Sequence, residues 1–223
     1  MGTRHLIGVV SGGVFKIAQY GQWDGYPEGQ GATVLGFLAG LGGDLSKFRE
    51  AVNNCRFMDE DETDNLGDDW QETHPQLSRD LGGNILNHVL ARGGCPLFDA
   101  SAFGADSLIC EWAYIIDLDA ETLEFYDGFQ TAPHGTGRWG EAPGVIPYKG
   151  CKSTYYGVRL LKVYPLAELP TVADLQKDAG EEIEGQMDLS SMMRRRRHDP
   201  AQHLRGPLQL GQVVHRRAAR GRR

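Results

Sequence analysis

The densest group of chemically capable side chains in this sequence is the loop of residues 19–31, which reads Gln-Tyr-Gly-Gln-Trp-Asp-Gly-Tyr-Pro-Glu-Gly-Gln-Gly. Its aromatic rings can stack on a planar ligand, and its amide and carboxylate groups can read polar edges. Its glycines let backbone N–H groups approach an anion, above all at the start of a following helix. The sequence therefore predicts a binding site for a small polar or planar ligand, formed by Arg4, Tyr20, Gln22, Trp23, Asp24, Tyr26 and Gln30.

The 19–31 loop also has a structural interpretation, which stays open here. Trp23 can fill a core, and Asp24 can cap a turn rich in glycine and proline. The guanidinium of Arg4 suits a ligand carboxylate or phosphate, but an ion pair with Asp24 or Glu28 is the favoured use. A third interpretation makes the loop an exposed aromatic patch of a protein-interaction module. The loop carries no Gly-x-Gly-x-x-Gly fingerprint and no lysine of a phosphate-binding loop.

Two carboxylates further along the chain are candidates for acid–base chemistry. Glu111 lies in an apolar stretch, where burial raises the pKa of a carboxyl and suits it to general acid or base work. Pairing of Glu111 with a buried arginine is the favoured alternative. Asp106 precedes the same stretch, where it can assist catalysis or form a turn. These residues support an alternative function, a hydrolase acting on an amide or a nucleotide.

The sequence predicts no metal ion and no cofactor. The acidic residues 59–64 lack the glycine and the glutamate that a calcium-binding EF-hand loop needs at its sixth and twelfth positions, so residues 58–69 are predicted to form a solvated loop. The histidines show no metal-ligand spacing. The four cysteines form no Cys-x-x-Cys pair, which favours reduced thiols in an intracellular protein.

Charge is distributed very unevenly along the 223 residues. The last 30 carry ten arginines and one acid, a net charge of +9, against −16 for the rest of the chain. An acidic body argues against a nucleic-acid-binding core, so we expect nucleic acid to bind through the basic tail if at all. No apolar run is long enough to predict a membrane span or a signal peptide. We expect a cytoplasmic protein, with a nuclear location as the alternative that the arginines allow.

The predicted elements that position these residues form an α+β domain. Runs of strands and runs of helices follow one another, which favours an antiparallel sheet flanked by helices. One domain is predicted over residues 2–178, followed by a disordered arginine-rich tail over 179–223. The predicted strands cover residues 3–10, 14–20, 108–117, 123–126 and 155–164; the predicted helices lie near 34–41, 45–52 (capped by Asp44), 81–89 (capped by Ser78) and after Thr171; and residues 127–150 form a long loop.

Two sequence runs carry a resemblance to a family. Residues 2–6, Gly-Thr-Arg-His-Leu, and the run Gln-Tyr-Gly-Gln-Trp-Asp-Gly-Tyr-Pro resemble an uncharacterised family of phage, bacterial and fungal proteins, and the likeness extends to about residue 175. The arginine tail departs from that family. Because no activity is established for it, the resemblance assigns no functional residue.

A second likeness is architectural. A strand at the extreme N-terminus, its hairpin partner and then helices resemble the amino-terminal-nucleophile hydrolases, whose terminal Cys, Ser or Thr uses its own α-amine as a base. In this chain Thr3 takes that role only if Gly2 is removed together with Met1.

Overall fold

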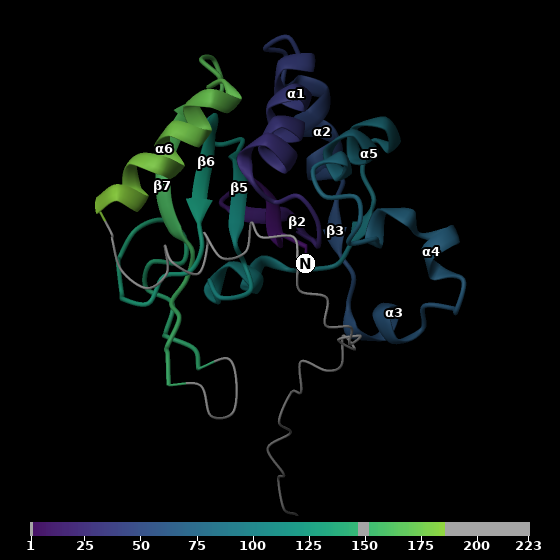
Figure 1. Cartoon of the computed structure of the whole chain (residues 1–223). Helices are drawn as coiled ribbons and strands as arrows, with labels where there is room; N and C mark the ends of the chain where they lie inside the picture. The colour runs from purple at the N-terminus through teal and green to yellow at the C-terminus, as the bar shows by residue number, and fades with distance from the viewer. Residues whose placement is uncertain (1, 147–151, 186–223) are drawn as a thin grey trace, which may run out of the picture. The chain divides into compact units, whose positions relative to one another are not determined.

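A computed structural model describes residues 2–146 and 152–185 of the chain (Figure 1). The arginine-rich run from residue 194 onward lies outside the described residues, so its predicted disorder and its predicted nucleic-acid contacts stay predictions. Among the described helices, none has both the length and the apolar character needed to cross a membrane.

A five-stranded sheet forms the centre of the fold, and it confirms the predicted α+β class. Its strands are β1 (His5–Ser11), β2 (Val14–Gly21), β5 (Trp112–Asp117), β6 (Thr122–Asp127) and β7 (Arg159–Pro165), in the order β2-β1-β5-β6-β7. Three of the four pairings are antiparallel, whereas β1 and β5 pair in parallel. A parallel pair requires the chain to return to the starting end of the first strand. Strand β2 makes that return, because Gly21 at its end and Trp112 at the start of β5 both pair with His5.

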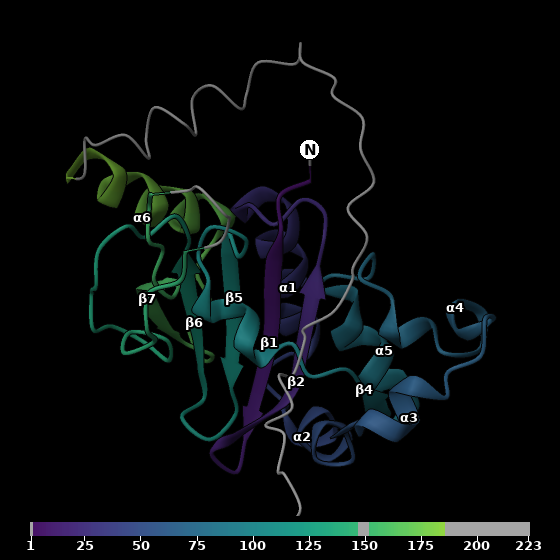
Figure 2. The same ribbon diagram turned by 90° about the horizontal axis from the view of Figure 1, so that it is seen from below.

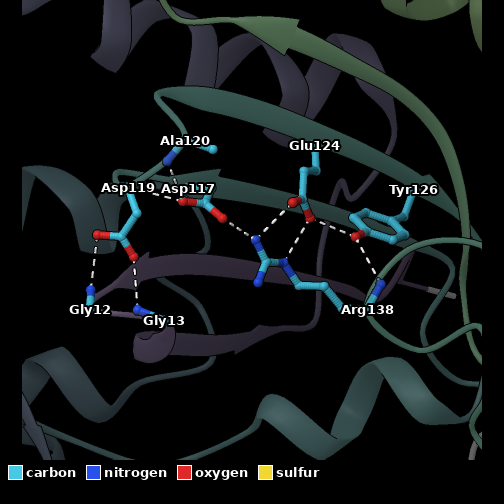
Figure 3. Close-up of polar contacts among 8 residues, drawn as sticks. All are labelled: Gly12, Gly13, Asp117, Asp119, Ala120, Glu124, Tyr126 and Arg138. Carbon is cyan, nitrogen blue, oxygen red and sulfur yellow. Dashed lines mark hydrogen bonds and ion pairs between the residues drawn. The ribbon is translucent and has the colours of Figure 1, made fainter.

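The β1–β2 hairpin turns at Gly12 and Gly13, as predicted. Both glycines have positive φ, 65° and 75°, which a two-residue hairpin turn of this kind requires and which L side chains rarely adopt. The carboxylate of Asp119, in the β5–β6 turn, accepts hydrogen bonds from the N–H groups of Gly12 at 3.0 Å and Gly13 at 2.8 Å. The two turns are therefore fastened to each other at one end of the sheet, as Figure 3 shows.

Helices cover one face of this sheet (Figure 2). They are α1 (Ala32–Gly40), α2 (Ser46–Asn53), α5 (Asn84–Arg92) and α6 (Val172–Gly185). Their apolar residues join those of the sheet in the larger of two hydrophobic clusters, which includes Ile7, Phe37, Phe48, Ile85 and Leu175. This face of the sheet is called the helix face below.

The opposite face, called the loop face below, is covered by the short helix η3 (Ser101–Ala105) and by part of the long segment after β6. Leu6, Val10, Ile115 and Tyr126 form a second cluster there with the buried Trp139. The predicted loop over 127–150 is therefore packed onto the sheet through Trp139, and its residues 147–150 lie outside the described residues.

Arg138, from the same segment, adds a second anchor. Its guanidinium bonds Glu124 through Nε at 2.8 Å and Nη2 at 2.7 Å, and Nη2 also reaches Asp117 at 2.5 Å (Figure 3). Tyr126 donates its hydroxyl hydrogen to Glu124 at 2.6 Å and accepts the Arg138 N–H at 3.3 Å. This close, partly bidentate geometry commits the guanidinium to holding the loop on β5 and β6.

The smaller elements correct one prediction. They are η1 (Pro27–Gly31), β3 (Arg56–Phe57), α3 (Glu60–Asp64), α4 (Trp70–Thr73), η2 (Pro75–Leu77) and β4 (Pro96–Leu97). Residues 58–69 are not only a loop, because Asp59 and Glu62 form a reciprocal capping box that starts α3.

Four elements have boundaries that differ from the predictions by more than two residues. Helix α5 begins at Asn84, while the hydroxyl of Ser78 accepts the Asp80 N–H and so forms a turn before the helix. Strand β5 begins at Trp112, because residues 106–110 turn before it. Strand β7 begins at Arg159, and Tyr155 instead forms an isolated bridge. Helix α6 extends past residue 178, to Gly185.

The start of α6 confirms the predicted capping box. Thr171 donates its backbone N–H to the Asp174 carboxylate at 2.8 Å, and its hydroxyl accepts the Asp174 N–H at 3.2 Å. The predicted cap of α2 is wrong, because Leu45 occupies the N-cap position without a side-chain cap bond. Asp44 lies one residue earlier and accepts the Ser46 N–H at 2.9 Å.

Candidate functional site

The 19–31 loop leaves the end of β2 and divides between the two faces of the sheet. Tyr20 is the cross-strand partner of Leu6, so its side chain lies on the loop face with Leu6. After Trp23 the chain turns to the helix face, where the Gly25 carbonyl accepts the buried Tyr114 hydroxyl at 3.0 Å and η1 leads into α1. The seven predicted site residues therefore do not form one surface.

Arg4 lies beside the first half of the loop, and its ion pair differs from the predicted one. Its partner is Glu111 at 3.5 Å, not Asp24 or Glu28, and Nη2 also approaches the Leu108 carbonyl at 3.3 Å. Glu111 is thereby paired with an arginine, the alternative that the sequence favoured, and it also accepts the Arg4 backbone N–H at 3.4 Å.

The guanidinium of Arg4 is only partly used. Charge-assisted hydrogen bonds normally measure about 2.7–2.9 Å, so both of its side-chain contacts are long. Within residues 2–146 and 152–185, Nε and Nη1 of Arg4 donate to no protein group, and the side chain keeps 23% of its surface exposed. Arg138 is the opposite case, because its fork is bound closely by two carboxylates. Nε and Nη1 of Arg4 can therefore donate hydrogen bonds to a ligand.

Tyr20 and Gln22 extend the group around Arg4. The Tyr20 hydroxyl donates to the Gln22 side-chain oxygen, and its ring meets the Phe103 ring edge-on at 4.8 Å. Burial raises the pKa of Tyr20, while the positive charges of Arg4 and Arg79 act in the opposite direction. Arg4 and Arg79 thus each lie within electrostatic range of the Tyr20 hydroxyl, as does the carboxylate of Asp80, which raises the pKa.

Asp106 belongs to the same end of the sheet. Partial burial raises the pKa of its carboxyl, against the Leu108 N–H and the charge of Arg4, which lower it. The carboxylate accepts that Leu108 N–H at 3.1 Å, so Asp106 also forms the turn that the sequence offered as its structural interpretation. Asp106 is therefore both the candidate for acid–base chemistry and the residue that forms the turn.

Trp23 is exposed, with 48% of its surface accessible. Its Nε1 donates to Asp80 at 2.9 Å, and a Cβ on Gly2 would lie 2.6 Å from its ring. The N-terminal segment that carries Arg4 therefore runs against Trp23. The ring does not fill the core, which removes one structural interpretation of this residue.

The second half of the loop contacts the helices instead. The Gln30 side-chain oxygen accepts the Gly83 N–H at 2.7 Å, at the start of α5, and its amide donates to the Trp23 carbonyl at 3.3 Å. The Tyr26 hydroxyl donates to Asp24 at 3.2 Å. Asp24 has a positive φ of 57°, and its carbonyl accepts the Gln30 N–H at 2.8 Å. These contacts hold the loop's own shape.

We expect Gln30→Ala to lower the free energy of unfolding by about 1 kcal/mol, because it removes the acceptor for a backbone N–H at a helix N-terminus. Gln30→Glu should recover only part of this loss, since a carboxylate accepts the Gly83 N–H and suits the helix dipole but cannot donate to the Trp23 carbonyl. Urea unfolding of the three proteins measures this. Equal stability of the alanine variant would show that Gln30 does not fasten the loop.

His5 is the buried group next to this site. Its ring lies over Gly21, where a Cβ would come within 2.1 Å of Nε2, and a Cβ on Gly25 would lie 2.9 Å from the His5 Cβ. Neither ring nitrogen has a hydrogen-bond partner among the described residues. Burial lowers the pKa of His5 to about 4, despite the Thr3 backbone and the Asp24 carboxylate, which raise it.

Nucleophiles near Asp106 are poorly placed for the hydrolase alternative. The Ser107 side chain is fully buried, and its oxygen accepts the Gln130 N–H at 2.8 Å. Cys110 is also fully buried, and burial raises the pKa of its thiol. The Thr3 carbonyl accepts the Gly25 N–H at 2.9 Å, and its proposed role after loss of Gly2 stays a prediction.

The surface also has two hollows away from this site. One of about 510 Å³ is lined mostly by apolar and glycine residues, including Leu38 and Leu169. The other, of about 620 Å³, lies between Phe15, Phe57 and Arg138. Neither lining includes a predicted site residue, and Arg138 in the second is already bound by Glu124 and Asp117. Among the described residues, no three His, Cys, Asp or Glu side chains are placed to hold a metal.

Sequence reasoning missed Arg79, Asp80 and Phe103. Residues 78–83 receive the loop through several contacts, among them Gln22 N–H to the Arg79 carbonyl at 3.2 Å and the Gln19 amide to the Ser78 carbonyl at 2.9 Å. No local pattern links this segment to the 19–31 loop. The only sequence signal in this segment is the Ser-Arg-Asp run of residues 78–80. That run predicted a helix cap and no contact with the 19–31 loop.

Searches of protein-family models, of curated proteins and of solved structures found no match to this chain. The resemblance to the phage, bacterial and fungal family and the likeness to amino-terminal-nucleophile hydrolases therefore stay predictions. The function has to be argued from the geometry of the site.

Proposed function

We propose that this protein binds a small anion that carries a planar ring, at the end of the sheet where Arg4, Tyr20, Gln22 and Trp23 lie. The observation that carries the proposal is the guanidinium of Arg4, which keeps Nε and Nη1 free of protein acceptors within the described residues and is partly exposed. A guanidinium fork with two free donors matches a carboxylate or phosphate.

The surroundings of Arg4 support a ring-bearing ligand over a bare ion. The exposed indole of Trp23 offers a stacking surface. The Tyr20 hydroxyl and the Gln22 side chain offer polar contacts beside it. Arg79 adds a second positive charge within electrostatic range of Tyr20.

Backbone strain near the site agrees with a binding role. Phe129 has a φ of 61°, which is unusual for a large side chain. Its N–H donates to the Ser107 carbonyl at 2.7 Å, and the neighbouring Gly128 lies so close to Cys110 and Glu111 that a Cβ there would clash. Such strain persists where surrounding structure fixes it and is concentrated at functional sites.

The test follows the Trp23 indole N–H signal by NMR, identified by its loss in Trp23→Phe. The probes are two ring-bearing anions, adenosine monophosphate and benzoate. Inorganic phosphate and adenosine serve as controls, because each has only the anion or only the ring of adenosine monophosphate. We expect at least one ring-bearing anion to shift the signal saturably and to bind more tightly than phosphate or adenosine.

Arg4→Gln should weaken that binding at least about tenfold, because a charged hydrogen bond to the anion is worth about 1.5–3 kcal/mol. The matched control is Arg56→Gln, since Arg56 is an exposed arginine that pairs with Glu62. Unchanged affinity in Arg4→Gln, or no saturable shift with either ring-bearing anion, would contradict the proposal.

A further inference from the structure

Two buried cysteines lie side by side at the start of the small β3–β4 sheet. These strands pair in parallel with Arg56 opposite Pro96, and Cys55 and Cys95 immediately precede those two residues. Both cysteines are free thiols, with only 4% and 8% of their surface exposed.

Contacts on both sides of the pair keep the two chain segments together. The Asn54 side chain donates to the Gly93 carbonyl at 3.0 Å, and a Cβ on Gly94 would lie 2.5 Å from the Asn54 Cβ. After the pair, the Met58 N–H donates to the Leu97 carbonyl at 2.9 Å. Neighbouring strands lie about 4.7–4.9 Å apart, and a disulfide spans Cα atoms about 4.4–6.8 Å apart.

We propose that Cys55 and Cys95 form a reversible dithiol–disulfide site that exchanges with small organic disulfides of the oxidised-glutathione type. Cys110 is buried in the other hydrophobic cluster, and Cys151 lies outside the described residues. The register of β3 and β4 singles out this pair.

The two thiols have different roles in the exchange. A hydrogen bond from the Cys95 thiol lowers the pKa of Cys55 to about 7, with a smaller contribution from Lys16, and the same interaction raises the pKa of Cys95. The thiolate is the attacking form of a cysteine, so Cys55 is the nucleophile and Cys95 the resolving thiol.

The reaction balances as two successive exchanges. The Cys55 thiolate attacks one sulfur of the small disulfide, which breaks its S–S bond, releases one thiol and leaves a mixed disulfide on Cys55. Cys95 then gives up its proton and attacks the Cys55 sulfur, which releases the second small thiol. Both cysteines are oxidised, the small disulfide is reduced, and the two protons leave on the two released thiols.

Both thiols are buried, so the exchange requires local opening. Helices α3 and α4, which follow β3, contain no buried residue, and lightly packed segments open locally at low free-energy cost.

The experiment incubates the full chain with oxidised glutathione, quenches by alkylation in denaturant, and maps peptides by mass spectrometry. The native protein should lose the mass of two hydrogen atoms and give one linked peptide pair containing Cys55 and Cys95. Cys95→Ser should stop at a single glutathione adduct on Cys55, and Cys55→Ser should form no linked pair. Cys110→Ser, the control, should behave as the native protein does.

The peptide map of the native protein tests the proposed disulfide even where a serine variant folds poorly. A linked pair that involves Cys110 or Cys151, a glutathione adduct without a linked pair, or no reaction at all would overturn the proposal.

Discussion

Arg138→Met is expected to lower the free energy of unfolding by about 3 kcal/mol. The substitution keeps the apolar stem of the side chain and removes the cation that Glu124 and Asp117 share, while both carboxylates stay 14–15% exposed. Removing one partner of a buried ion pair costs about 3–5 kcal/mol, because the remaining charge stays without compensation. The quarter of the Arg138 side chain that is exposed places the effect at the lower end of that range.

Urea unfolding measures this, and two further variants interpret it. Arg138→Lys should recover only part of the stability, since an ammonium cannot reproduce the two bonds that Nε and Nη2 make to Glu124. Arg56→Met breaks an ion pair whose arginine is 57% exposed and should change the stability far less than Arg138→Met does. Equal effects of Arg138→Met and Arg56→Met would show that the Arg138 network does not anchor the loop after β6.

Lowering the pH from about 7.5 to about 4.5 is expected to cost the folded protein about 2–3 kcal/mol through His5 alone. The folded-state pKa of about 4 lies below the ordinary value of 6.5. Between these values the unfolded chain binds the proton and the folded chain does not, so stability falls as the pH falls through this window and levels off below pH 4. Burial is the cause, because it lowers the pKa of His5 by more than the Thr3 backbone and the Asp24 carboxylate raise it.

Other groups also titrate in this range, so the prediction concerns the difference in acid sensitivity between the native protein and a variant that lacks the His5 ring. His5→Leu should remove about 2–3 kcal/mol of the loss seen in the native protein. Urea unfolding at the two pH values gives this difference. The same acid sensitivity in native and His5→Leu proteins would show that His5 is not the buried titrating group.

Local features of the fold were predictable because a few neighbouring residues determine them. Gly12 and Gly13 adopt the positive φ that a tight hairpin needs, and Thr171 with Asp174 shows the spacing of a capping box. Asp59 and Glu62 have the same spacing. Their capping box was not predicted, because the many acidic residues around them indicated a solvated loop.

Long-range pairing could not be predicted from the same patterns. Strand β5 joins β1 in parallel although residues 12–111 lie between them, and no local signal specifies which edge it takes. Arg4 therefore pairs with Glu111, 107 positions away, rather than with the nearby acids Asp24 and Glu28. The division of the 19–31 loop between two faces follows from its contacts with residues 78–83, which are equally remote in sequence.

The candidate site is accordingly smaller than the sequence predicted. Arg4, Tyr20, Gln22 and Trp23 remain together at one end of the sheet. Gln30 holds the start of α5. Asp24 and Tyr26 bond to each other within the loop. The unused donors of Arg4 became visible only once every acceptor around its guanidinium was placed.

Native mass spectrometry of the protein purified from a cell extract, beside the same sample denatured, tests the proposed site most directly. We expect a small anionic compound with a planar ring to add mass to the native protein, to be lost on denaturation, and to be absent from Arg4→Gln. Arg56→Gln should retain it. The same compound bound to Arg4→Gln, or no added mass on the native protein, would contradict a ligand site at Arg4.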